Sequence, residues 1–295
     1  MAPNPAESGR LALLCAAAEH IGPVSAPHGP VAAPDAAGAA YTGPTPPAWA
    51  LAEYVVAGWL VGEDVVMGID TGRTFWGWLL TTESEAVVVL RGTEDAAEWG
   101  ADIEGWPVES AGLPGVVEQG FASIFETLEL VPASADPASA AAASVAADPT
   151  GPSEIAAELA AVVGDRRVTV TGHSLGACLA EYLTYMLAGL LPPHMPDGRT
   201  VRVRGRYFES PRPGDAGFAA AFQARVTDYT VWRYAPDLVP DLPPWNTPLA
   251  YVTVLPPNPA ICDTPICNHH AQNISWLIDP TATDIVPACR AACGG

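Results

Sequence analysis

A serine between two glycines stands out as a candidate nucleophile. The stretch VTVTGHSLGACLAEYL at residues 168–183 places Ser174 at the centre of the pattern GHSLG. A β-branched run precedes this pattern and an apolar run follows it, so the serine falls at a strand-to-helix turn. Small neighbours permit so tight a turn, and the helix N-terminus stabilises negative charge that develops beside the hydroxyl. The alternative is that Ser174 only caps the helix, as serine often does.

A nucleophilic serine needs a base that accepts its proton and a carboxylate that orients the base. Three histidines follow Ser174: His194, His269 and His270. His194 comes after the helix that leads away from the turn, which leaves the adjacent pair as candidates. Metal binding is the other interpretation of a histidine pair, but adjacent residues of an extended segment face opposite ways. His173 is next to the nucleophile, and because neighbouring side chains in such a turn diverge, we interpret it as a structural residue beneath the turn.

Asp237 is the predicted orienting carboxylate. It follows the strand pattern YTVWRY at residues 229–234 in a short loop, and catalytic groups gather at the ends of such strands. Two rivals remain open. Asp228 precedes the strand and should lie at the opposite edge, whereas Asp241 lies farther out in a proline-rich stretch and should face solvent.

Composition limits the partners. The 295-residue chain has 33 acidic and 13 basic residues, all of the latter arginine, and a formal net charge of -20. Such a surface repels nucleic acid and anionic lipid, so we expect no nucleic-acid partner, but it is compatible with a neutral ester. No run approaches the roughly 20 apolar residues of a transmembrane segment. The N-terminus lacks the basic cluster of a secretory signal, which predicts a cytoplasmic protein if the chain is full length and a secreted one if a leader was removed.

Strand and helix patterns alternate along the chain, which predicts the α/β class, with a mostly parallel sheet covered by helices on both faces. We expect a single domain over residues 1–295, with an irregular N-terminal extension over 1–45 and a low-complexity surface insertion over 131–152. A short helix is expected near residues 11–20. The expected strands cover residues 73–81, 85–90, 167–171, 202–208, 229–233 and 250–254, and the other helices cover 48–61, 116–130, 155–163, 175–191 and 216–224.

Six cysteines leave the redox state open. Cys178 follows GHSLG and is predicted to be a small buried residue. The other clustered cysteines are Cys262, Cys267, Cys289 and Cys293. They fit two disulfides, free thiols or a metal site, but their spacing differs from the usual zinc pairs, so we predict no metal.

Four separated segments resemble the class 3 lipases, a family that includes fungal triacylglycerol lipases. Their order and rough spacing match the family from about residue 55 to residue 280. Each motif is modest alone, and together they are specific. The segments are VVVLRGTEDAAEWGAD at 87–102, TGHSLGA at 171–177, YFESPRPGDAGFAAAF at 207–222 and RYAPDLVPDLPP at 233–244.

The resemblance implies an α/β-hydrolase fold and hydrolysis of carboxylic esters without a cofactor. It assigns Ser174, Asp237 and His269 to a catalytic triad, with His270 as the one-residue alternative for the base. Triacylglycerol lipase is the leading activity, and phospholipase or short-chain esterase are alternatives with the same triad. The implied partner is a small-molecule or lipid ester, met at a transient lipid–water interface. A non-catalytic binding scaffold is the alternative of a different class.

The resemblance also implies residues around the triad. The oxyanion hole would combine the backbone N–H groups of Thr93 and Leu175. Trp99 falls in the segment that forms a mobile lid in relatives, and Trp99 with Trp106 would be apolar contacts of a short amphipathic helix. Trp99 as a core anchor is the alternative. The chain departs from the family pattern at Glu209, where relatives usually carry Gly or Ala, and at Ile274 and Gln119.

Overall fold

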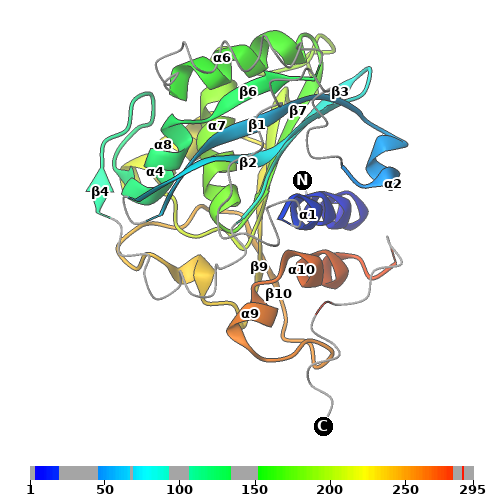
Figure 1. The fold of residues 1–295 in the computed structure, drawn as a ribbon, viewed down its shortest axis with the longest axis vertical. Helices are drawn as coiled ribbons and strands as arrows, with labels where there is room; N and C mark the ends of the chain where they lie inside the picture. The colour runs from blue at the N-terminus through cyan, green and yellow to red at the C-terminus, as the bar shows by residue number, and fades with distance from the viewer. Residues whose placement is uncertain are drawn as a thin grey trace.

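One large sheet organises the molecule (Figure 1). The computed structural model describes residues 4–19, 46–66, 69–92, 106–133, 152–281 and 288. Within these ranges, eight strands form a sheet in the order β10-β9-β8-β7-β3-β2-β1-β6. The strands are β1 (Val55–Val66), β2 (Ile69–Thr81), β3 (Glu85–Leu90), β6 (Glu129–Pro132), β7 (Arg167–His173), β8 (Val203–Phe208), β9 (Tyr229–Tyr234) and β10 (Val252–Leu255), and a separate two-stranded sheet pairs β4 (Pro107–Val108) with β5 (Val117–Glu118).

The half of the sheet that ends in the functional loops is parallel. Strands β3, β7, β8, β9 and β10 pair in parallel, and β2, β1 and β6 continue the sheet in antiparallel fashion. The apolar run of β3 is buried along nearly its whole length, as a strand covered on both faces requires. Because parallel strands share a direction, the loops after β3, β7, β8 and β9 meet at one edge.

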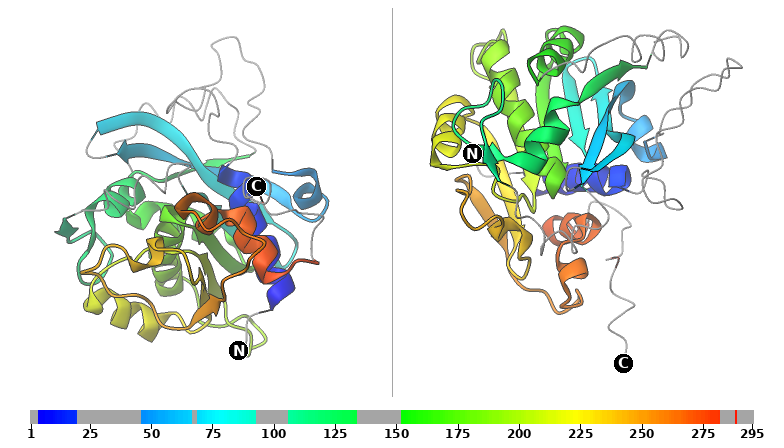
Figure 2. Two further views of the ribbon diagram at one scale, coloured as in Figure 1. Left: turned by 90° about the horizontal axis from the view of Figure 1, so that it is seen from below. Right: turned by 60° about the vertical axis from the view of Figure 1, so that its left-hand side comes forward.

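Helices cover both faces, as expected from the alternating pattern. One apolar cluster packs α4, α6, α7 and α8 on one face, and the other packs α1 and α10 on the opposite face. Figures 1 and 2 both place α1 beside α10, where Ser275 Oγ donates a hydrogen bond to the Gly9 carbonyl at 2.7 Å. The described helices are α1 (Pro5–Glu19), α2 (Ala48–Leu51), α4 (Gln119–Glu126), α6 (Pro152–Val163), α7 (Leu175–Leu190), α8 (Ala216–Arg225), the short η1 (Val239–Asp241), α9 (Pro265–Asn268) and α10 (Ala271–Ile278).

The predicted helix over residues 48–61 is wrong after its first turn. Helix α2 ends at Leu51, and β1 begins at Val55 between β2 and β6. Leu60 packs into the cluster on one face of the sheet, whereas Trp59 packs against the other. A strand with apolar residues on both faces has no period of two in its hydrophobicity, so the sequence pattern resembled a wide helical face. The predicted helix over 116–130 is likewise shortened to Gln119–Glu126, with β5 before it and β6 after it.

The N-terminal segment is more ordered than expected where it is described. The short predicted helix extends from Pro5 to Glu19, and its apolar residues are buried in the cluster with α10. That part of the predicted irregular extension over 1–45 is therefore core, while residues 20–45 lie outside the described residues. The predicted insertion over 131–152 also lies mostly outside them. No helix in the described ranges has the length and apolar character to cross a bilayer.

The structure gives the redox state of two of the four clustered cysteines. Cys262 and Cys267 are disulfide-bonded, and Cys178 is a free, buried thiol as predicted. Cys289 and Cys293 lie outside the described residues.

Glu181 is a buried carboxyl group in α7 that makes the free energy of unfolding depend on pH. Among the described residues, no donor is in good hydrogen-bond geometry with either of its carboxyl oxygens, and burial outweighs the nearby Ser210 hydroxyl and raises its pKa well above the usual value. The folded protein therefore keeps a proton that the unfolded chain releases above pH 4.5, so the free energy of unfolding falls as pH rises from there. We expect Glu181→Gln to remove this dependence. In urea titrations, the free energy of unfolding of the variant should exceed that of the wild type by an amount that grows by about 1 kcal/mol per pH unit above about pH 5. An equal gain at every pH would contradict a buried neutral carboxyl.

Candidate active site

The GHSLG segment forms the sharp turn that its glycines predict. Strand β7 ends at His173, helix α7 begins at Leu175, and Ser174 between them has φ 55° and ψ −131°. A non-glycine residue with this backbone is strained, and such strain concentrates at functional sites. Glycine is required on both sides. A Cβ atom at Gly176 would lie 2.2 Å from the carbonyl oxygen of Arg91, and one at Gly172 would lie 2.1 Å from that of Gly176.

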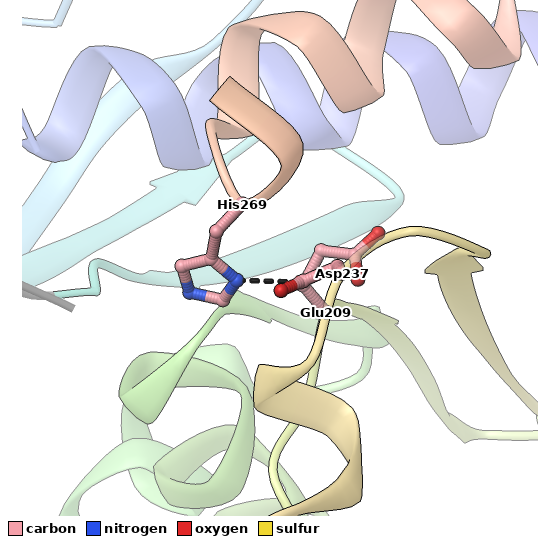
Figure 3. A group of neighbouring side chains, drawn as sticks. All are labelled: Glu209, Asp237 and His269. Atoms are coloured by element: carbon pink, nitrogen blue, oxygen red, sulfur yellow. Dashed lines mark hydrogen bonds and ion pairs between the residues drawn. The ribbon is translucent and has the colours of Figure 1, made fainter. Parts of the chain in front are cut away.

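Three residues that are far apart in the sequence form one chain of hydrogen bonds. His269 Nε2 lies 2.7 Å from Ser174 Oγ. His269 Nδ1 lies 2.6 Å from Asp237 Oδ2, the contact dashed in Figure 3. All three side chains are buried. In this arrangement Nδ1–H donates to the carboxylate, which leaves Nε2 as the acceptor for the serine proton. The structure thus brings together the three residues that the sequence singled out.

Backbone contacts hold Asp237 and His269 in place. Strand β9 ends at Tyr234, whose carbonyl accepts the N–H of Asp237 at 3.0 Å, and Asp237 Oδ1 accepts the N–H of Val239 at 3.1 Å. The N–H of His269 donates to the carbonyl of Pro265 at 3.1 Å, which ties the base to the end of α9. Both anchors orient the side chain without occupying the atoms that join the triad.

The rival histidines lie outside this chain. His270 is the N-cap of α10, where its Nδ1 accepts the N–H of Gln272 at 3.2 Å. His194 is exposed on the loop after α7 and bridges to Val201.

The rival carboxylates are bound elsewhere. Asp241, whose side chain is 45% exposed, forms ion pairs with Arg233 at 2.5 Å and Arg212 at 3.2 Å. Asp228 pairs with Arg206 at 2.9 Å. Both rivals neutralise arginines rather than orient a histidine.

The predicted oxyanion hole is described only in part. Leu175 is the first residue of α7, so its N–H has no partner within the helix and adjoins Ser174. Thr93 lies outside the described residues, but Gly92 before it passes close to the nucleophile. A Cβ atom at Gly92 would lie 2.9 Å from the Cβ atom of Ser174. Of the two predicted lid contacts, Trp99 also lies outside the described residues, and Trp106 is 77% exposed.

A second pair, Glu19 and His173, was not predicted from the sequence and packs against His269, with the histidine buried and the glutamate partly buried. His173 Nδ1 lies 2.6 Å from Glu19 Oε1, and the same oxygen accepts the N–H of Gly92 at 3.2 Å. The rings of His173 and His269 have centroids 4.7 Å apart. Burial opposes charge on His173, but Glu19 outweighs it and raises the pKa of that imidazole. Glu19 ends α1 and no local pattern links it to residue 173, so only the packing of α1 on the sheet reveals this pair.

Glu209 is another buried carboxyl group at the site. Its Oε1 accepts the N–H of Tyr234 at 2.6 Å, and burial followed by the charge of Asp237 raises its pKa well above the usual value. Glu209, Asp237 and His269 are also the one group, within the described ranges, whose ligand atoms are close enough to hold a metal ion, within 4.8 Å of one another. His269 Nδ1 and Asp237 Oδ2 already satisfy each other, so this geometry fits proton transfer better than metal binding.

Electrostatics keeps the base neutral near physiological pH. Burial lowers the pKa of His269, and the attraction of Asp237 offsets this only in part, while the neighbouring His173 adds to the lowering. Burial opposes ionisation of Asp237, yet the charge and the hydrogen bond of His269 leave its pKa below the usual value. At neutral pH the pair is therefore a carboxylate beside a neutral imidazole.

This charge state predicts a pH profile. If neutral His269 accepts the serine proton, kcat/KM should rise with pH and level off once the imidazole is deprotonated. Because the pKa of His269 is lowered, the midpoint of that rise should lie below pH 6.5. Hydrolysis of a soluble short-chain ester, measured at constant ionic strength, provides the profile. A midpoint clearly above pH 6.5 would show that Asp237 outweighs burial.

A mostly parallel sheet with a serine at a strand-to-helix turn, followed in the chain by an aspartate and a histidine, is the α/β-hydrolase arrangement. The family described as Lipase (class 3) matches residues 87–247, more than half of the chain. The chain belongs to the class 3 lipase family.

Particular relatives differ in how much they share with this chain. A protein of Oryza sativa subsp. indica named Phospholipase A1-II 2 is 31% identical over a 207-residue alignment, which covers 61% of this chain and 45% of the rice protein. The chain therefore matches about half the length of that relative. Among solved structures, a triacylglycerol lipase from Penicillium expansum is 17% identical, with 85% of this chain and 78% of that chain covered and a TM-score of 0.48. A mutant form of MDLA from Penicillium cyclopium is 21% identical, with 63% and 60% covered and a TM-score of 0.45.

Proposed function

We propose that this protein hydrolyses carboxylic esters of lipids through a Ser174–His269–Asp237 triad. The observation that carries the proposal is the unbroken chain of buried hydrogen bonds, 2.7 Å and 2.6 Å long, that ends on a serine with a strained backbone. Membership of the class 3 lipase family supports lipid esters as the substrate class.

The geometry supports a two-step acyl transfer. Ser174 Oγ attacks the ester carbonyl carbon while His269 Nε2 takes its proton, and Asp237 stabilises the imidazolium that forms. The N–H of Leu175, with Thr93 as the proposed second donor, stabilises the oxyanion. When the tetrahedral intermediate collapses, His269 returns the proton to the leaving alcohol. Water, deprotonated by the same imidazole, then attacks the acyl-enzyme, and the carboxylic acid leaves as Ser174 recovers its proton.

Triacylglycerol hydrolysis is the leading form of the proposal, and one observation favours a second form. The rice relative carries the name of a phospholipase A1, and its identity with this chain is higher than that of either Penicillium protein. Phospholipase A1 activity is therefore the second candidate, with the same triad and a different fit to the headgroup.

The test compares p-nitrophenyl esters from acetate to palmitate, then a triacylglycerol emulsion and phosphatidylcholine vesicles. His269→Ala should be inactive on all of them, whereas His270→Ala should keep wild-type rates because His270 caps α10 and lies outside the hydrogen-bonded chain of Ser174, His269 and Asp237. Faster release of fatty acid from the emulsion supports the lipase form, and faster release from the vesicles supports the phospholipase form. If the wild type cleaves no ester and does not react with a serine-directed phosphonate, the protein is a non-catalytic scaffold.

A further inference from the structure

One side chain beside the triad has no role in the mechanism above and is costly to keep where it is. Glu209 follows β8 directly, is fully buried, and has φ 49°, a conformation in which glycine would be relaxed. Its N–H donates to the carbonyl of Trp232 at 2.8 Å, so the backbone is held in this position. Strain and a buried carboxyl each destabilise the folded state. Both destabilising features belong to Glu209, which adjoins Asp237.

The two oxygens of Glu209 have different surroundings. Oε1 accepts the N–H of Tyr234 at 2.6 Å, whereas Oε2 has no hydrogen-bond partner among the described residues. The acceptor nearby is Asp237, since ligand atoms of the two carboxyl groups lie within 4.8 Å of each other (Figure 3). Two carboxylate oxygens cannot bond to each other, because both are acceptors. A proton on Oε2 supplies the missing donor and removes the repulsion between the two groups.

We propose that Glu209 is a positioning residue of the triad, whose neutral carboxyl group donates a hydrogen bond to the Asp237 carboxylate and so sets the basicity of His269. The inference rests on the proposed function, since it concerns how that triad is tuned. Asp237 then accepts three bonds, from His269, from the N–H of Val239 and from Glu209. The shared proton spreads the negative charge of Asp237 and weakens its pull on the His269 proton.

Other charged groups face Glu209, Asp237 and His269 and influence their pKa values. Arg233 of β9 interacts electrostatically with both carboxyl groups, but its guanidinium forms an ion pair with Asp241 at 2.5 Å. On the other side, His173 at the end of β7 and Glu19 at the end of α1 face His269 as a partly buried ion pair with opposing effects on its pKa. Burial and the charge of Asp237 both raise the pKa of Glu209, so its carboxyl is neutral when Asp237 is ionised.

Two substitutions of Glu209 separate the effect of hydrogen-bond donation from the effect of side-chain packing. Glu209→Gln keeps the size, the neutral state and an N–H donor. Glu209→Ala keeps the Cβ atom and the backbone strain but removes the donor. Glu181→Gln is the matched control, because Glu181 is an equally buried carboxyl with a raised pKa that lies outside the triad.

The first measurement is the pH profile of kcat/KM on p-nitrophenyl butyrate, with active sites counted by phosphonate titration. Glu209→Gln and Glu181→Gln should keep the wild-type midpoint. Glu209→Ala should move it upward by roughly half a pH unit, because Asp237 regains its full charge beside His269, and should lower kcat about tenfold. A wild-type midpoint in Glu209→Ala overturns the proposal, and so does a lower midpoint in Glu209→Gln, which would mean that Glu209 is ionised.

The second measurement does not require activity. An infrared difference spectrum between the wild type and Glu209→Gln at neutral pH should contain the carbonyl stretch of a protonated carboxyl group. Its absence overturns the inference even if the enzyme is active. If the wild type neither hydrolyses esters nor reacts with the phosphonate, the proposed function fails, while this band still reports the state of Glu209. Activation by added Zn²⁺ that is lost in Glu209→Gln would also overturn the inference in favour of a metal site.

Discussion

Ser174→Ala is expected to lower kcat on every ester substrate by roughly 10⁴–10⁶-fold, the loss that follows when a serine nucleophile is removed. The substitution deletes only Oγ, the atom that lies 2.7 Å from His269 Nε2. KM should change little, because no other group in contact with the substrate is altered. Steady-state kinetics with a burst assay on p-nitrophenyl butyrate would measure both quantities, since the burst reports formation of the acyl-enzyme.

The backbone at this position supplies a matched control. Ser174→Gly should be as inactive as Ser174→Ala, but it should also relieve the strain of φ 55°. We expect thermal unfolding to place Ser174→Gly about 1 kcal/mol above Ser174→Ala in stability. Residual activity in Ser174→Ala near the wild-type rate would exclude Ser174 as the nucleophile.

Asp237→Asn has the second largest expected effect, a loss of roughly 10⁴-fold in kcat with the fold intact. The carboxylate accepts Nδ1–H of His269 at 2.6 Å, and this bond leaves Nε2 without a proton and ready to act as the base. An asparagine that turns its amide group toward Nδ1 would favour the other tautomer, in which Nε2 carries the proton and cannot take one from Ser174.

Asp241→Asn is the control for this prediction. Asp241 is the nearest rival in the sequence, but the structure pairs it with Arg233 and Arg212. Its substitution should change kcat less than tenfold and should reduce stability by at most about 1 kcal/mol, as expected for a partly exposed ion pair. Equal losses in the two variants, measured by phosphonate titration and kinetics together, would contradict the assignment of the acid.

The pair of Glu19 and His173 connects the N-terminal helix to the proposed active site, although the proposed mechanism does not use either side chain. Glu19 holds both the imidazole beside the nucleophile and the N–H of Gly92, which precedes the proposed oxyanion donor Thr93. Helix α1 is therefore part of the support of the site, although it lies far before Ser174 in the chain.

Local patterns were sufficient for the parts of the protein that depend on neighbours in the sequence. The β-branched run, the two glycines and the apolar helix at residues 168–183 identify a strand-to-helix turn, because such a turn restricts the residues that can occupy it. The alternation of strands and helices likewise predicts the α/β class. The same local reasoning was wrong for residues 48–61, because a strand covered on both faces lacks the period of two by which a strand is recognised.

Only the tertiary structure decided which distant side chains meet. Local patterns do not separate His269 from His270, and the family resemblance prefers His269 by a margin of one residue. Their difference in the structure arises because His269 is the C-cap of α9 and His270 is the N-cap of α10. The sequence shows Glu209 only as a departure from the family pattern, whereas the structure shows that its carboxyl group is buried beside Asp237. Contacts such as Glu19 with His173 depend on how α1 packs on the sheet. Hydrophobic periodicity predicts that a helix has a buried face, but the partners of its polar residues follow from the assembled fold.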